Sequence, residues 1–437
     1  MTEKENSIGH RSKKYFIYMM IILALVQIMD AYSTSYTAAF PSKIIKEFLI
    51  TPFGLDATTS QAIMQIVIAI ATLGIYFVFF NQYFSDKFGR KTMLFITTLG
   101  MGLSALLLAL SINIYLYTVF LLLTYLFFNS DMWLIYAGEE SPPEKKASYI
   151  NILLACGILG PIMMPIFRSL FITETTPVWA WRGMTLLPIF LGIPLSFIIL
   201  FTIKETKIYE EGKITKQFEV SNIILKDNVK NLLQSNRKNE IWALLIMGFF
   251  AGMNFNFMQM AESFLDTNTI LTENDASLII TIVALAVIIG YLSIGFLADR
   301  IGRIPLLYFC SIILPIGTIL LYLGSVLTVG VLAVCALGLS LGYVGFNGLL
   351  IVIRIVIQEL VPTDKRGTGL GIRSLATSLG ITIGFVLGSI FTLTISNLGI
   401  SFIILSLPVL SHIYLIPKFI KETKGTDLSE VELRLKG

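Results

Sequence analysis

Two carboxylic acids lie inside long apolar stretches of this 437-residue chain, where an ionised group is costly. Asp30 lies about 24 Å beyond Lys14 if the stretch between them is helical. Desolvation at such a depth favours the protonated acid, and the neighbouring Tyr32 adds a second polar group. This chemistry suits proton transfer, whereas the alternative is a permanent ion pair with an arginine, for which Arg168 is the candidate. Asp131 either lines a cavity or pairs with a buried cation.

Amide and guanidinium groups occupy other apolar stretches. Asn254, Asn256 and Gln259 fall close together, and residues 256 and 259 share one face of a helix. Amides both donate and accept hydrogen bonds, so they suit recognition of hydroxyl or carboxylate groups, with interhelical bonding as the alternative. Arg354 either binds an anionic solute or extends its head group to the membrane surface.

Short charged motifs occur twice, about 215 residues apart. Phe84-Ser85-Asp86-Lys87-Phe88-Gly89-Arg90-Lys91 corresponds to a segment that contains Asp299, Gly302 and Arg303. Two further segments that combine acids with bases also recur. Because the acids are duplicated together with the bases, we expect ion pairs between them that hold one face of the protein closed in one state; the alternative is ordinary loop charge. The remaining members are Glu139, Glu205, Glu359, Arg366 and Glu422.

The elements that carry these residues are membrane-spanning helices. Hydrophobic residues make up 55% of the chain and charged residues 14%, against about 25% charged in soluble domains. The fold class is therefore an all-α membrane protein with twelve transmembrane helices in two pseudo-symmetric halves of six. The predicted spans are 15–40, 60–84, 92–111, 115–137, 149–172, 184–203, 240–262, 277–297, 306–325, 331–357, 371–394 and 399–419.

Basic residues indicate the orientation of these spans. With both termini cytoplasmic, 26 of the 32 lysines and arginines fall in inner segments and four in outer ones. The domains are then residues 1–203, a cytoplasmic linker with an amphipathic helix at 204–239, and residues 240–437 with a short cytoplasmic tail. The net charge of +4 follows from this loop bias and implies no nucleic-acid partner.

The duplicated loop motif resembles that of the major facilitator superfamily, over essentially the whole chain. Tyr136-x-x-Glu139-x-x-Pro142, Trp181-Arg182 and the segment 420–425 are similar to motifs of its sugar-porter and metabolite–proton symporter branches. The resemblance implies alternating access and assigns Glu139, Glu205, Glu359 and Glu422 as partners of the motif arginines.

The expected function is secondary active transport of a small polar organic solute, such as a sugar, carboxylate or aromatic acid, by proton symport across the cell membrane. A multidrug or metabolite:proton antiporter, a uniporter and a transporter-like nutrient sensor are the alternatives. We expect a monomer in the lipid bilayer, with no enzyme activity, no cofactor and no metal site, since the chain has only two histidines and no phosphate-binding loop.

Overall fold

The computed structural model describes residues 12–77, 84–85, 87–127, 132–142, 145–207, 209–210, 237–361 and 366–424. Within these residues, twelve helical segments are long and apolar enough to cross a membrane, which confirms the predicted all-α membrane fold. The predicted linker helix lies within residues that the structure does not describe, as do Asp86 and Asp131; the backbone of Arg366 is described but its side chain is not.

The chain divides into two compact units, composed of residues 1–36, 74–167 and 182–220, and of residues 37–73, 168–181 and 221–437. The second unit therefore contains two segments from the first half of the sequence. The helices of the first unit are α1 (Lys13–Ser33), α6 (Arg90–Ala109), α7 (Ile114–Phe127), α8 (Met132–Glu140), α9 (Lys146–Gly157), α10 (Leu159–Phe171, which enters the second unit at its end) and α11 (Ile193–Thr202).

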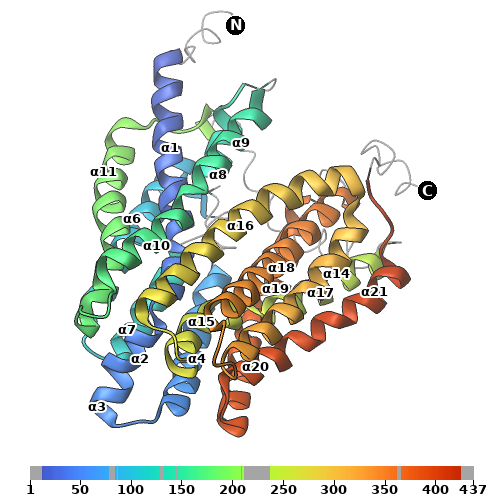
Figure 1. Cartoon of the computed structure of the whole chain (residues 1–437). Helices are drawn as coiled ribbons and strands as arrows, with labels where there is room; N and C mark the ends of the chain where they lie inside the picture. Colours follow the sequence, from blue (N-terminus) through green and yellow to red (C-terminus); the bar gives the residue numbers. More distant parts are fainter. Residues whose placement is uncertain are drawn as a thin grey trace, which may run out of the picture. The chain divides into compact units, whose positions relative to one another are not determined.

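The second unit contains all of the long helices of the second half. Its helices are α2 (Pro41–Ile45), α3 (Thr51–Phe53), α4 (Ala57–Thr72), α14 (Lys238–Met253), α15 (Phe255–Asn268), α16 (Glu273–Ile301), α17 (Arg303–Gly324), α18 (Val331–Leu360), α19 (Arg366–Ile395), α20 (Leu398–Ser406) and α21 (His412–Phe419). In Figure 1, α17 and α18 run side by side, and α14 and α4 both pack against α19.

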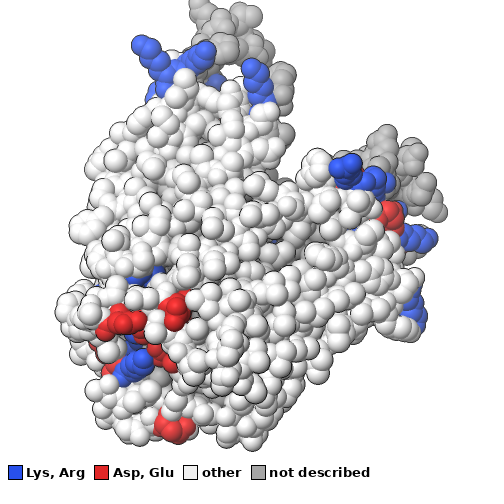
Figure 2. Space-filling model, in the orientation of Figure 1, with Lys and Arg blue, Asp and Glu red and all other residues white. Residues whose placement is uncertain are grey.

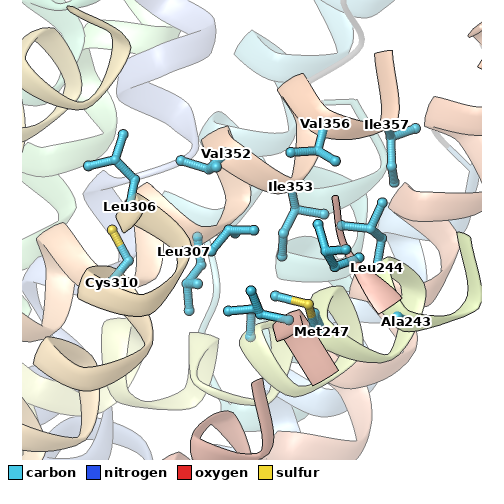
Figure 3. Close-up of a cluster of buried hydrophobic side chains, with 14 of the residues drawn as sticks. Ala243, Leu244, Met247, Leu306, Leu307, Cys310, Val352, Ile353, Val356 and Ile357 are labelled. Atoms are coloured by element: carbon cyan, nitrogen blue, oxygen red, sulfur yellow. The ribbon is translucent and has the colours of Figure 1, made fainter. Parts of the chain in front are cut away.

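Each unit is stabilised by a core of aliphatic side chains. In the second unit, Leu244 and Met247 of α14 meet Leu307 of α17 and Ile353 of α18 (Figure 3). In the first unit, Leu23 of α1 lies in a cluster with residues of α6, α8 and α11. These contacts bring spans that are distant in sequence together and fix the ends that carry the charged motifs.

The first span ends earlier than the sequence predicted. The helix was expected to reach residue 40, but α1 ends at Ser33. The hydroxyl groups of Thr34 and Ser35 bond the carbonyl oxygen of Ala31, which competes with continuation of the helix. Phe40 precedes a proline and has φ −148°, outside the helical region, before α2 begins at Pro41. A polar bend therefore follows Asp30.

Candidate functional site

Arg303 is the centre of a charged cluster at the start of α17. Its Nη2 lies 2.6 Å from Glu359 Oε1 and its Nε donates to Glu359 Oε2 over 3.1 Å, so the pair is bidentate. The same guanidinium contacts Asp299 at 3.2 Å and donates to the carbonyl oxygen of Ala298. Arg303 is 7% exposed, and the pair joins the start of α17 to the end of α18.

A second carboxylate, Glu422, binds the backbone at the same helix start. Its oxygens accept from the backbone N–H groups of Arg303 and Ile304, at 2.9 and 3.0 Å. Burial is the largest single effect and raises the pKa of the Glu422 carboxyl. The backbone N–H groups that donate to it, led by that of Arg303, together outweigh burial and hold the pKa below its usual value. Thr423 donates its hydroxyl to Glu359, so the segment that follows the last helical span is joined to the end of α18.

Glycine is required between α16 and α17. Gly302 has φ +103°, a conformation that side chains rarely adopt. A Cβ there would also lie 2.5 Å from Glu422 Oε2. The motif glycine thus permits both the turn and the close approach of the acid. We name Arg303, Glu359, Glu422 and Thr423 the second motif cluster.

The first unit repeats this arrangement. Arg90 Nε donates to Glu139 at 2.9 Å, the Lys91 backbone N–H donates to Glu205 at 3.0 Å, and Thr206 donates its hydroxyl to Glu139. Gly89 has φ +101°, and Glu205 occupies the place of its absent side chain. We name Arg90, Glu139, Glu205 and Thr206 the first motif cluster.

The motif arginines that the structure describes therefore contact the expected acids, and the structure adds the two threonines; Asp86 and the side chain of Arg366 lie outside the described residues. Because Thr206 and Thr423 each follow the helix-capping acid directly, the repeated Lys-Glu-Thr-Lys segment was the signal for their role. Both clusters join spans of the same half of the sequence.

Asp30 lies near the end of α1 in the first unit and is 5% exposed. Tyr32 donates its hydroxyl to the carbonyl oxygen of Met184 over 2.7 Å and stacks on Tyr36, with ring centroids 5.3 Å apart. The side chain of Tyr32, two residues beyond Asp30, is thus fixed at both its hydroxyl group and its ring.

The amide residues lie in the second unit, where the seventh span is interrupted at Asn254 between α14 and α15. The Asn254 amide donates to the carbonyl oxygen of Phe250, and Asn256 donates to Gln65 Oε1 at 2.6 Å. Gln259 accepts from the hydroxyl of Thr37 over 3.4 Å. Among the described residues, the Oδ1 atoms of Asn254 and Asn256 have no hydrogen-bond donor, although both residues are fully buried. The site therefore retains free acceptors.

Arg168 and Arg354 differ in their surroundings. Arg168 is fully buried and lies 3.2 Å from carboxylate oxygens of Glu262 and of Glu273. Arg354 is exposed on α18, and within the described part of the chain it makes no ion pair.

Sequence reasoning did not identify Glu262. Its signal was its place on α15, three residues beyond Gln259 and therefore on the same helix face.

Comparison with known proteins agrees with this arrangement of spans and motifs. The chain is 25% identical to "Putative metabolite transport protein YncC" of Bacillus subtilis, over 88% of each chain. It is 26% identical to the facilitated trehalose transporter Tret1 of Apis mellifera ligustica, over 69% of this chain and 65% of the relative.

The fold is that of solved transporters. A crystal structure of a D-xylose-proton symporter superposes with a TM-score of 0.76 at 18% identity, over 94% of this chain and 99% of the other. The sequence profile of the Major Facilitator Superfamily matches residues 15–261 and 243–432. This protein is therefore a multi-pass membrane transporter and belongs to the Major Facilitator Superfamily.

Proposed function

We propose that the protein is a proton-coupled symporter of a small polar organic solute, working by alternating access in the cell membrane with both termini cytoplasmic. Its relatives are described as metabolite and trehalose transporters, and the D-xylose-proton symporter shares its fold. Sugars, carboxylates and aromatic acids are the solute classes to be tested.

The buried carboxyl group of Asp30 is the observation that carries the coupling. Ionisable groups within membrane spans are costly and are retained where they serve ion movement. Asp30 is 5% exposed within a span that contains no other acid. A carboxyl group that is exposed alternately to each side of the membrane can carry one proton per cycle.

The free amide oxygens of Asn254 and Asn256 support a solute that donates hydrogen bonds. A buried acceptor without a donor costs about 1–3 kcal/mol, which a bound hydroxyl group would recover. Asn254 and Asn256 supply two such acceptors at the break between α14 and α15.

Uptake into proteoliposomes tests the function. The purified chain is supplied with sugars, carboxylates and aromatic acids, with and without an inward proton gradient. We expect one class to accumulate only with the gradient. Asp30→Asn should abolish accumulation but retain exchange at equal pH, because Asn keeps the size of the side chain and cannot release a proton. Glu174→Gln, which changes an exposed acid, is the matched control and should transport normally. Full accumulation by Asp30→Asn would exclude Asp30 as the coupling residue.

A further inference from the structure

Six charged residues gather in the second unit near the ends of α2, α10, α15 and α16. The three bases come from the first half of the sequence, and the three acids come from the second. The bases are Lys43, Lys46 and Arg168, and the acids are Glu262, Asp266 and Glu273. Figure 2 shows acidic and basic side chains gathered at the lower left, over the region of α2 and α15, within a largely uncharged surface.

Arg168 is the most buried member of this set. Its Nη2 atom lies 3.2 Å from Glu262 Oε1 and 3.2 Å from Glu273 Oε2, and its Nη1 donates to the carbonyl oxygen of Ala39. One guanidinium thus bridges two helices of the second half, α15 and α16. Because Arg168 is fully buried, loss of either acid would leave charge in a region with little water.

Glu262 has further partners from the first half of the sequence. The backbone N–H and the hydroxyl of Ser42 donate to its two oxygens, at 2.9 and 2.7 Å. Both groups belong to α2, so each of these contacts to the Glu262 carboxylate, like that of Arg168, joins one half of the sequence to the other.

The two lysines complete the set at its margin. Lys43 pairs with Glu273, and Lys46 lies 2.8 Å from Asp266. Burial is the largest effect and lowers the pKa of the Lys43 ammonium. The negative charges of Glu262 and Asp266 act in the opposite direction and offset part of this effect. The Lys46 side chain is 40% exposed and that of Asp266 11%, so this pair can be altered without opening the core.

We propose that these six residues form a cross-half network, with Arg168 as its central positioning residue, which closes this end of the transporter and must separate for the transport cycle to proceed. The inference rests on the alternating access of the proposed function. The two motif clusters join spans within one half, so rocking of the halves leaves them intact. Every pair of the cross-half network, in contrast, joins one half to the other.

Access of a thiol reagent to a buried position tests the network. Ser263 is fully buried, and its hydroxyl accepts from Gln61 of the first half over 3.2 Å. Ser263→Cys in the full-length chain is labelled with a maleimide in detergent, and labelling of the parent chain, which contains Cys156, Cys310 and Cys335, is subtracted. The rate reports how often this end opens, and it requires neither solute nor a proton gradient.

Loss of one acid should open this end. We expect Glu273→Gln to raise the labelling rate by about ten-fold or more, because Arg168 and Lys43 lose a shared partner. Lys46→Asp should raise it about two- to five-fold, since its pair is partly exposed. Glu174 accepts from Asn274 of the second half over 3.4 Å, a bond that a glutamine oxygen can also accept, so Glu174→Gln removes only an exposed charge and should leave the rate unchanged.

Rescue separates the network from a general loss of packing. Lys46→Asp combined with Asp266→Lys restores opposite charges and should return the rate to within about two-fold of the parent. Should Glu273→Gln fail to fold, the Lys46 and Asp266 variants carry the test. Unchanged labelling in the single variants, or a double variant labelled as fast as Lys46→Asp alone, would overturn the proposal. If the variants are labelled at the expected rates but the parent chain shows no proton-driven uptake, the proposed function is wrong and the cross-half network stands.

Discussion

Gly302→Ala is the sharpest perturbation of the second motif cluster. The glycine has φ +103°, and a Cβ would lie 2.5 Å from Glu422 Oε2 and 2.9 Å from its Cδ. Alanine therefore meets two separate obstacles, an unfavourable backbone conformation and a carboxylate that must move. When Glu422 moves, the backbone N–H groups of Arg303 and Ile304 lose their acceptor.

The two costs can be estimated separately. A non-glycine residue in a sparsely populated backbone region costs about 1–3 kcal/mol. Each lost hydrogen bond costs about 0.5–1.5 kcal/mol, at the lower end here because water reaches this helix start. Together they give a destabilisation of roughly 2–5 kcal/mol. Gly295→Ala on α16, the helix that ends just before Gly302, is the matched control, because its Cβ would have no atom within 4 Å.

Thermal unfolding in detergent measures the effect. We expect Gly302→Ala to lower the apparent Tm by several degrees and Gly295→Ala to leave it unchanged or slightly raised, since alanine favours helices. In the background Glu422→Ala, the glycine substitution should cost only the backbone part, so the double variant is more stable than the sum of the single effects. Strict additivity would show that the carboxylate contact contributes nothing, and an unchanged Tm would refute the whole argument.

Three further predictions concern the ion pairs, the pH dependence and the topology. Arg303→Ala should slow exchange several-fold and leave solute binding within about two-fold, since the side chain holds the start of α17 to the end of α18 within one half and does not contact the solute; loss of binding in a folded variant with unchanged conformational populations would contradict this. The pKa of Glu422 is held below its ordinary value of 4.5, so its stabilisation is present above that pH and is lost as pH falls through the folded-state pKa. The Tm difference between the parent and Glu422→Gln should therefore shrink as the pH falls below 4.5 and disappear once the pH is below the folded-state pKa, and a constant difference would argue against the ionised form. Cysteines placed at the exposed residues Phe88 and Ile301 should react only from the cytoplasmic side in intact cells, and labelling from outside would reverse the orientation.

The spans and motif contacts could be predicted because they depend on local sequence. Long apolar stretches specify helices in a membrane, and an acid and an arginine at the ends of neighbouring spans need only a short reach to meet. Arg90 with Glu139, and Arg303 with Glu359, are such pairs. The roles of the site residues remain predictions, as does the division into halves.

The cross-half network could not be predicted in the same way. The seventh span was expected over residues 240–262, yet α15 continues to Asn268. Its last turns carry Glu262 and Asp266, which pair with bases from distant segments. Lys43 is one of the four basic residues counted in outer segments, and that count gave no sign that its side chain is paired and only 11% exposed. Charge pairing between segments more than 90 residues apart leaves no local pattern in the sequence.

The charge balance of the cross-half network also affects how strongly the network stabilises the closed state. Three bases and three acids leave it without net charge, so each charge has a partner when this end is closed. When this end opens, the same groups are hydrated again, and the free energy of this hydration offsets the loss of the ion pairs. Buried ion pairs are close to neutral in net free energy for this reason, even though deleting one partner costs about 3–5 kcal/mol. A transporter must populate both states, which requires the closed state to be favoured by only a few kcal/mol. A charge-balanced network supplies a specific contact at small net stability, whereas an apolar seal of equal area would favour closure much more strongly.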